Sequence, residues 1–199
     1  MKYTYLIIVA LCSIMFSAKA YSQKIEGYSS KNGVTVVQPE SEKFGFKEDT
    51  EYALMLFTDG TKKEYIIAVG TEKNVAHNFP DKAKLLFKTA DETVIALTAL
   101  HSFVGEEKNK VNAAAFYPIS KEQLESLTKG VIKVRLELLS IDKSGKAFVD
   151  AQEKEFKKDK IGEVLAKMEN AIDLELQKRA TEKEDAQKAL TRSDSTDNF

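Results

Sequence analysis

Apolar and polar residues alternate along much of the chain in short runs, the pattern of antiparallel strands joined by tight turns. The clearest case is residues 51–70, where two apolar runs flank Asp59-Gly60. This dipeptide suits the positive φ angles of a type I′ turn, so we predict a hairpin with such a turn. Residues 82–89 and 93–100 predict a second hairpin, in which the later run is apolar on both faces and is expected in the middle of a sheet or sandwich.

Further runs predict additional strands, one of them at a sheet edge. Residues 131–141 carry apolar side chains at alternate positions, as a strand with one solvated face does. Residues 146–156 follow a turn and are more polar, which suits an edge strand. Two more strands are expected at residues 33–38 and 111–119, whereas residues 101–110 are expected to form a loop.

Two helices are predicted, one short and one long. Ser120 stands three residues before Gln123, the spacing of a capping box, and predicts a helix over residues 121–129. From residue 159 to about residue 190 apolar side chains recur on one helical face. They are Ile161, Leu165, Met168, Ile172 and Leu176.

The end of the long helix differs from its beginning. Residues 178–189 are almost all charged residues and alanine. We expect the first half of the helix to dock on the sheet and the second half to project or fray. Residues 191–199 are expected to be disordered, because they are polar and lack a hydrophobic pattern.

Together these elements predict an α+β fold, mainly an antiparallel β-sheet or sandwich of about eight strands with one short helix and a long C-terminal helix. The boundaries follow from the same pattern. They are a signal peptide at residues 1–20, a flexible lead-in at 21–32, a β-rich domain with its docked helix at 33–176, and a charged helical extension with its tail at 177–199.

The N-terminal residues have the features of a secretory signal peptide. A lysine precedes the apolar run at residues 6–16, and an A-x-A pattern ends at Ala20. We expect cleavage between Ala20 and Tyr21; an uncleaved anchor is the weaker alternative, because the apolar segment barely approaches the length of a membrane span. The mature protein is then exported to the periplasm or cell envelope, or released from the cell, without a membrane span.

The composition narrows the classes of function. The single cysteine, Cys12, lies in the signal peptide, so the mature chain has no disulfide and no cysteine-based metal site. The net charge is −1, which argues against nucleic acid as a partner. The two histidines, His77 and His101, are weak candidates for a metal site with Glu106 or Glu107, because their spacing matches no zinc motif. We expect no catalytic residue and no cofactor.

The segment AAAFYP at residues 113–118 is a candidate small-molecule site. Alanines leave room between sheets, and aromatic side chains can form the floor of a cavity. The candidate ligand-binding residues are Ala113, Ala115, Phe116 and Tyr117. The alternative is that the alanines only allow a helix to pack closely against the sheet.

Two stretches, YPISKEQLESLTKGVIKVRLELL (residues 117–139) and EKEFKKDKIGEVLAKM (residues 153–168), resemble uncharacterised exported β-rich proteins of Gram-negative bacteria. In those proteins, too, a capped short helix leads into a strand, and a lysine-rich helix start lies near the end of the chain. The resemblance implies an envelope location and a β-rich domain, but no activity.

The favoured hypothesis is a non-enzymatic binding or interaction module of the cell envelope. Its working surface would be the C-terminal helix and the edge strand at residues 146–156, in contact with an unknown protein or a second copy of the chain. The alternative is a periplasmic carrier that holds a small apolar ligand in a cavity between its sheets. A metal-dependent hydrolase is the least favoured function.

Overall fold

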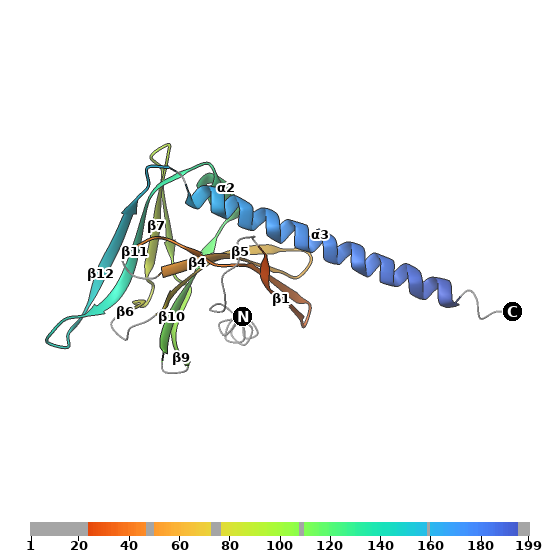
Figure 1. The fold of residues 1–199 in the computed structure, drawn as a ribbon, viewed down its shortest axis with the longest axis horizontal. Coiled ribbons are helices and arrows are strands. Elements are labelled where there is room, and N and C mark those ends of the chain that lie inside the picture. The colour runs from red at the N-terminus through yellow and green to blue at the C-terminus, as the bar shows by residue number, and fades with distance from the viewer. Residues whose placement is uncertain (1–23, 47–49, 73–76, 108–109, 159, 195–199) are drawn as a thin grey trace.

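The computed structural model describes residues 24–46, 50–72, 77–107, 110–158 and 160–194. In that part of the chain two antiparallel β-sheets pack together, and a short and a long helix lie against them (Figure 1). The α+β class, with mainly antiparallel strands in a sandwich-like arrangement, is therefore confirmed. The predicted signal peptide and its cleavage site, Ala20 and Tyr21, lie outside the described residues.

The first sheet has seven strands among the described residues: β1 (Ile25–Lys31), β2 (Val34–Pro39), β3 (Glu42–Lys43), β4 (Thr50–Thr58), β5 (Lys63–Glu72), β9 (His101–Glu107) and β10 (Lys110–Ile119). Their order is β1-β2-β4-β5-β10-β9, with β3 beside β4. The second sheet has five: β6 (His77–Asn78), β7 (Lys84–Thr89), β8 (Val94–Thr98), β11 (Val131–Ile141) and β12 (Ala147–Glu155). Their order is β12-β11-β7-β8, with β6 beside β11. The helices are α2 (Lys121–Thr128) and α3 (Ile161–Asp194).

The segment expected to be a flexible lead-in contains strand β1, so that expectation is wrong. β1 pairs with β2, and Lys31 lies opposite Val34 across a two-residue turn. The turn residues Asn32 and Gly33 have φ angles of 53° and 78°, the positive values that a type I′ turn requires. The turn geometry predicted for Asp59-Gly60 is found here instead.

The hairpin at residues 51–70 is confirmed, but its turn is not of type I′. Four residues separate Thr58 from Lys63, and of the first two only Gly60 has a positive φ, 90°. The Asp59 carboxylate instead accepts hydrogen bonds from the backbone N–H of Thr61 and of Lys62, both at 2.8 Å. A side-chain acceptor at the first turn position thus determines a longer loop.

Strands β8 and β9 correct two further expectations. The hairpin of β7 and β8 is confirmed, but β8 is at the edge of the second sheet and not inside it. Only one of its faces is covered, since Ile95 is 6% exposed and Val94 is 57% exposed. The segment expected to be a loop after β8 forms β9, because its backbone pairs along β10 from His101 to Glu107.

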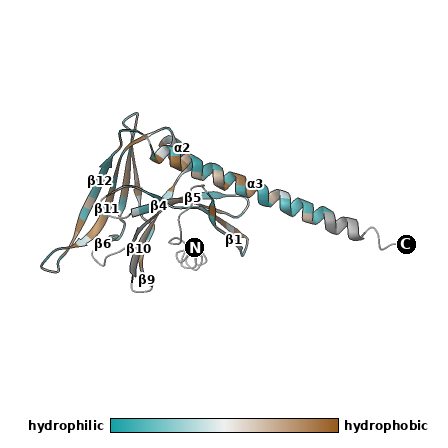
Figure 2. Cartoon of the chain, in the orientation of Figure 1, coloured by the Kyte–Doolittle hydropathy of each residue, from teal (hydrophilic) through white to brown (hydrophobic). Residues whose placement is uncertain are grey.

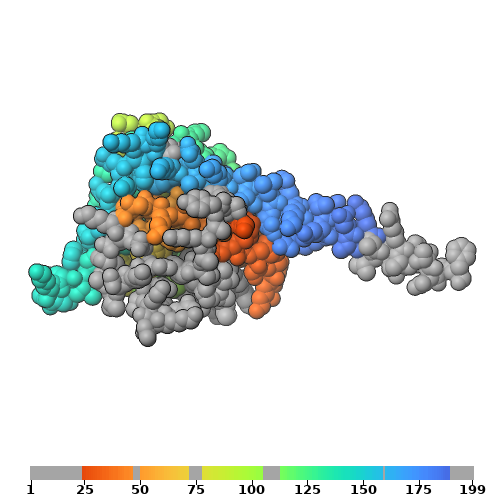
Figure 3. Space-filling view, in the orientation of Figure 1, coloured from red at the N-terminus to blue at the C-terminus, as the bar shows by residue number. Residues whose placement is uncertain are grey.

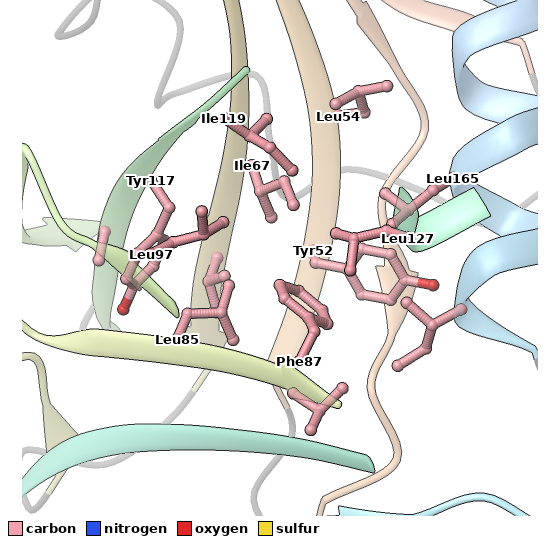
Figure 4. Packing of buried hydrophobic residues seen from close by; sticks show 14 of the residues in the cluster. Tyr52, Leu54, Ile67, Leu85, Phe87, Leu97, Tyr117, Ile119, Leu127 and Leu165 are labelled. Carbon is pink, nitrogen blue, oxygen red and sulfur yellow. The ribbon is translucent and has the colours of Figure 1, made fainter. Parts of the chain in front are cut away.

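The hydrophobic core lies between the two sheets and is closed at one end by the helices. We call the face of the first sheet that points toward the second sheet its inner face. Leu54 and Ile67 come from this face, and Leu85 and Phe87 come from the second sheet (Figure 4). Leu165 of α3 packs into the same cluster, so the helix contributes to the core between the two sheets.

Both predicted helices are confirmed. Ser120 Oγ accepts from the Gln123 N–H at 3.2 Å, and Gln123 Oε1 accepts from the Ser120 N–H at 3.0 Å, so the capping box begins α2. In α3 the first four residues of the predicted apolar stripe are buried, and the fifth, Leu176, is half-buried. Exposed fractions are 2% for Ile161 and 0% for Leu165, Met168 and Ile172. α3 then continues beyond the body of the protein (Figure 1), and hydrophilic residues replace the apolar ones along its extension (Figure 2).

Candidate functional site

The proximal half of α3 is fixed to the first sheet and to α2 by polar contacts as well as by the apolar stripe. The Lys63 ammonium lies 3.2 Å from the Asp173 carboxylate. Lys121 of α2 forms an ion pair with Glu169. Arg179 follows Asp173 by six residues, and its guanidinium lies 4.7 Å from the centroid of the Tyr28 ring in β1. Docking on the sheet therefore reaches as far as Arg179.

Beyond Arg179 the helix is exposed. All residues from 180 to 188 are exposed, and α3 runs on to Asp194. This segment of 15 residues, residues 180–194, is about 22 Å long at 1.5 Å per residue. We call it the distal helix. Ion pairs within α3 help to stabilise this region, among them Lys188 with Glu184 at 3.8 Å.

The charges around the start of the distal helix are balanced. Residues 178–188 contain four basic and three acidic side chains. A surface of this kind does not select a partner by net charge, as nucleic acid or an anionic membrane would be selected. Alternating signs on an exposed helix are instead typical of helices that pair with other helices.

The predicted edge strand is confirmed as β12, which pairs with β11 on one side and ends the second sheet. Ion pairs secure its C-terminal half, with Lys133 Nζ 2.7 Å from Glu153 Oε2. Its N-terminal half exposes apolar side chains: Phe148 is 46% exposed and Val149 is 55% exposed. This half of the strand combines an unpaired edge with apolar side chains, which suits the addition of another strand.

The distal helix and β12 do not form one continuous surface. The far end of α3 and the turn between β11 and β12 lie at opposite ends of the molecule (Figures 1 and 3). The helix and the adjoining strand were predicted to form one working surface, and the structure separates the distal helix from the exposed half of the strand.

The four candidate ligand-binding residues do not share a face. Ala113, Ala115 and Tyr117 belong to the core between the sheets, whereas Phe116 belongs to a cluster on the opposite face of the first sheet. Adjacent residues of a strand point to opposite faces, so a contiguous motif in β10 is divided in this way.

Tyr117 has a second unusual property. Its side chain is fully buried, and its hydroxyl oxygen has no hydrogen-bond partner among the residues that the structure describes. Burial, together with the nearby Glu137 carboxylate, raises the pKa of the phenol above its ordinary value. The hydroxyl therefore stays protonated and offers an unused donor inside the core.

The two histidines are in different sheets. His77 lies in β6 of the second sheet and pairs with Ser140, and His101 lies in β9 of the first sheet. The His101 ring is 6.4 Å from the ring of Phe103, centroid to centroid. Within the described residues no group of three or more histidine, cysteine, aspartate or glutamate side chains is arranged to hold a metal ion.

Gln38 in β2 was not among the predicted site residues. Its side chain is fully buried, and within the described part of the chain neither the nitrogen nor the oxygen of its amide has a hydrogen-bond partner. The available signal was its position in VTVVQ, because Gln38 follows Val34 and Val36 at the spacing of two that places residues on one face of a strand.

Comparison of the chain with protein-family models, curated proteins and solved structures finds no match. The resemblance to exported β-rich proteins therefore stays a prediction. None of the described helices has the length and apolar character needed to cross a membrane.

Proposed function

We propose that the protein is an exported, non-enzymatic binding module of the cell envelope that contacts its partner through the distal helix. The partner surface would be another helix, from a different protein or from a second copy of the chain. The edge of β12 would provide a separate contact. The proposal rests on one observation: α3 continues for about 15 residues after the contact of Arg179 with the Tyr28 ring of the first sheet.

The argument rests on how helices are stabilised. An isolated helix of about 12–15 residues is marginally stable in water, and most helices in proteins depend on burial of one face. The distal helix buries none of residues 180–188. A partner helix would supply the missing contacts, and the mixed charges would form ion pairs across the interface.

The test compares the exported protein with a chain that ends at Ala180. This truncation keeps the contact of Arg179 with Tyr28, and residues 181–188, which it removes, are all exposed. We expect native mass spectrometry to show a dimer or a defined complex for the wild type and a monomer for the truncated chain. The urea midpoint should not change, because exposed side chains contribute little to stability.

A matched control is Val94→Lys in β8, which alters an exposed apolar residue that lies in neither the distal helix nor β12. It should leave the association through the helix intact. A wild-type protein that is monomeric and free of partners, or a truncated chain that associates as the wild type does, would contradict the proposal.

The unpaired hydroxyl of Tyr117 favours a second candidate function, a carrier that holds a small ligand between the sheets. A ligand with one hydrogen-bond acceptor would satisfy this donor inside the apolar core. Mass spectrometry would then detect a bound small molecule in the exported protein. Ala115→Phe should reduce its occupancy with little loss of stability, whereas strong destabilisation would indicate a packed core at this position.

A further inference from the structure

Strand β12 is the longest of the described strands that lie at a sheet edge, and its backbone is regular. It has nine residues, whereas β1 and β9 have seven each and β8 has five. It pairs with β11 residue for residue without a bulge, and it contains neither proline nor glycine. Edge strands that resist further pairing are commonly short, bulged or interrupted by proline. β12 has none of these features, and no other described strand lies along its free edge (Figure 1).

Two hydrogen bonds show which backbone groups of β12 point to the free edge. The Phe156 N–H donates to the carbonyl oxygen of Ile132 at 2.8 Å. The carbonyl oxygen of Lys146 accepts from the Asp142 N–H at 3.0 Å. Phe156 and Lys146 thus point toward β11, and backbone groups alternate in direction along a strand. The odd-numbered residues from 147 to 155 therefore direct their N–H and C=O groups to the free edge.

The charged side chains of β12 differ between its two faces. On the face directed away from the first sheet, Lys133 lies 2.7 Å from Glu153 and 3.6 Å from Glu155. These two carboxylates are therefore neutralised within the second sheet. On the opposite face, Asp150 and Lys154 form no ion pair with another described residue. This face has one positive and one negative charge that an added strand could pair with.

The even-numbered side chains of this region form a symmetric series. They lie on the side of the core between the sheets, because Phe156, directly after β12, packs against that core. The series is Phe148, Asp150, Gln152, Lys154 and Phe156. The two charges on either side of Gln152 have opposite signs. In an antiparallel pair of these strands centred on Gln152, each Asp150 therefore lies opposite the Lys154 of the second copy. Each Phe148, which is 46% exposed, lies opposite a Phe156.

The charges favour this register over the other symmetric ones. A two-fold axis perpendicular to the sheet places the central residue opposite its own counterpart. Centres at Asp150, Glu153 or Lys154 would thus place like charges opposite each other. A centre at Ala151 would place no opposite charges across from each other within the strand. With the centre at Gln152, the odd-numbered residues form the hydrogen bonds. The even-numbered side chains meet in the non-hydrogen-bonded pairs, where opposite Cα atoms are about 4.5 Å apart.

We infer that β12 pairs with β12 of a second copy of the chain, antiparallel about a two-fold axis at Gln152, so that the two second sheets become one continuous sheet. This inference names the partner of the separate β12 contact, and in that respect it rests on the proposed function. One strand from each copy makes an interface of the small class, below about 1,200 Å², which is typical of weak association. The β12 contact is therefore expected at roughly 100 µM protein and above, not at the lower concentrations of native mass spectrometry.

The test is a symmetric disulfide at position 152. Cys12 is the only cysteine of the chain, so exported protein that begins at Tyr21 by intact mass has none. Gln152→Cys brings two thiols together at a Cα separation of about 4.5 Å, which a disulfide can bridge. At about 200 µM protein under mild oxidation, we expect most of the chain to become a disulfide-linked dimer. Val149→Cys, at a position 55% exposed, is the matched control, because its two thiols would lie about 20 Å apart along the strands. It should form less than about a tenth as much dimer.

Charge reversal tests the register itself. In the Gln152→Cys background, Asp150→Lys or Lys154→Asp places like charges opposite each other, so each should reduce cross-linking about fivefold or more. An equal mixture of the two variants restores opposite charges at both positions of a mixed dimer. The mixture should therefore cross-link as the parent does. Contact through the distal helix involves none of these positions and lies at the other end of the molecule (Figure 1), so either contact can fail without the other.

A measurement on the wild type needs no substitution. Hydrogen exchange followed by NMR should show the amide hydrogens of Val149, Ala151, Glu153 and Glu155 exchanging roughly twofold or more slowly at high protein concentration than at low. Four results would overturn the inference. They are exchange that does not depend on concentration, equal cross-linking of Gln152→Cys and Val149→Cys, charge reversals that cross-link as the parent does, and a mixture that does not recover. A strand of a different protein as the partner of β12 would appear as the second of them.

Discussion

Tyr117→Phe should stabilise the protein, which is unusual for a substitution in a hydrophobic core. The Tyr117 side chain is fully buried and no described residue forms a hydrogen bond with its hydroxyl, so the folded state carries the cost of removing that hydroxyl from water. Such an unpaired group costs about 1–3 kcal/mol. The small hole left by the oxygen, on the order of 10–15 Å³, costs about 0.3 kcal/mol at ~24 cal/mol per Å³.

The net effect is a gain of about 0.7–2.7 kcal/mol in the free energy of unfolding. Urea denaturation followed by circular dichroism would show a higher midpoint with an unchanged slope. The melting temperature should rise by roughly 2–4 °C for each kcal/mol. Tyr65→Phe is the matched control, because Tyr65 is also in the core, 5% exposed, but its hydroxyl is not among the unpaired buried atoms. It should change stability by less than about 0.5 kcal/mol.

A loss of 1 kcal/mol or more in Tyr117→Phe would refute this reasoning. It would mean that the hydroxyl has a partner in the folded protein, a bound water or the polar atom of a ligand. A ligand atom as the partner would support the carrier function. The mass of the purified protein would distinguish a bound ligand from a bound water.

Three further predictions concern the helix, a carboxylate and a turn. Leu165→Ala should destabilise the protein by about 2–5 kcal/mol, because the side chain is fully buried, whereas Leu174→Ala, 56% exposed, should cost less than about 0.5 kcal/mol in the same urea assay. Glu26→Gln should raise the urea midpoint at neutral pH but not below pH 4.5. Because the folded-state pKa of Glu26 is raised, its contribution to stability is complete below the ordinary value of 4.5 and is lost as the pH rises through the folded-state pKa. An equal effect of the substitution at all pH values would contradict the raised pKa. Gly33→Ala should cost about 1–2 kcal/mol from backbone strain alone, since φ is 78° and an added Cβ would meet no atom within 4 Å; an unchanged melting temperature would show that the turn adopts another geometry.

The elements that the sequence predicts correctly are those whose signals are local. The capping box of Ser120 and Gln123 is a contact between residues three apart, and the α3 stripe requires only a helical repeat. Strand β1 was not predicted because its sequence, IEGYSSK, is largely polar and does not alternate between apolar and polar residues. Its pairing depends on the two-residue turn at Asn32-Gly33, a signal that the sequence contains and the analysis did not use.

Burial of a strand depends on its place in the sheet, which sequence alone does not show. The run at residues 93–100 is apolar on both faces, yet β8 is an edge strand and Val94 is exposed. The candidate ligand site was divided for a related reason. The composition of residues 113–118 was informative, but alternation along β10 directs Phe116 away from Tyr117, and only the position of β10 between two sheet faces shows what each side chain contacts.

Strand β4 is buried on both of its faces, which changes the sequence pattern that such a strand shows. Antiparallel sheets commonly cover one face and leave the other in water, so their strands alternate between buried and exposed residues. In β4, by contrast, all six residues from Tyr52 to Phe57 are buried. Tyr52, Leu54 and Leu56 face the core between the sheets, while Met55 and Phe57 belong to the second buried cluster, on the opposite face of the first sheet. Burial on both faces requires apolar residues at consecutive positions, so residues 52–57 read as a continuous apolar run, whereas residues 131–141 of β11 alternate.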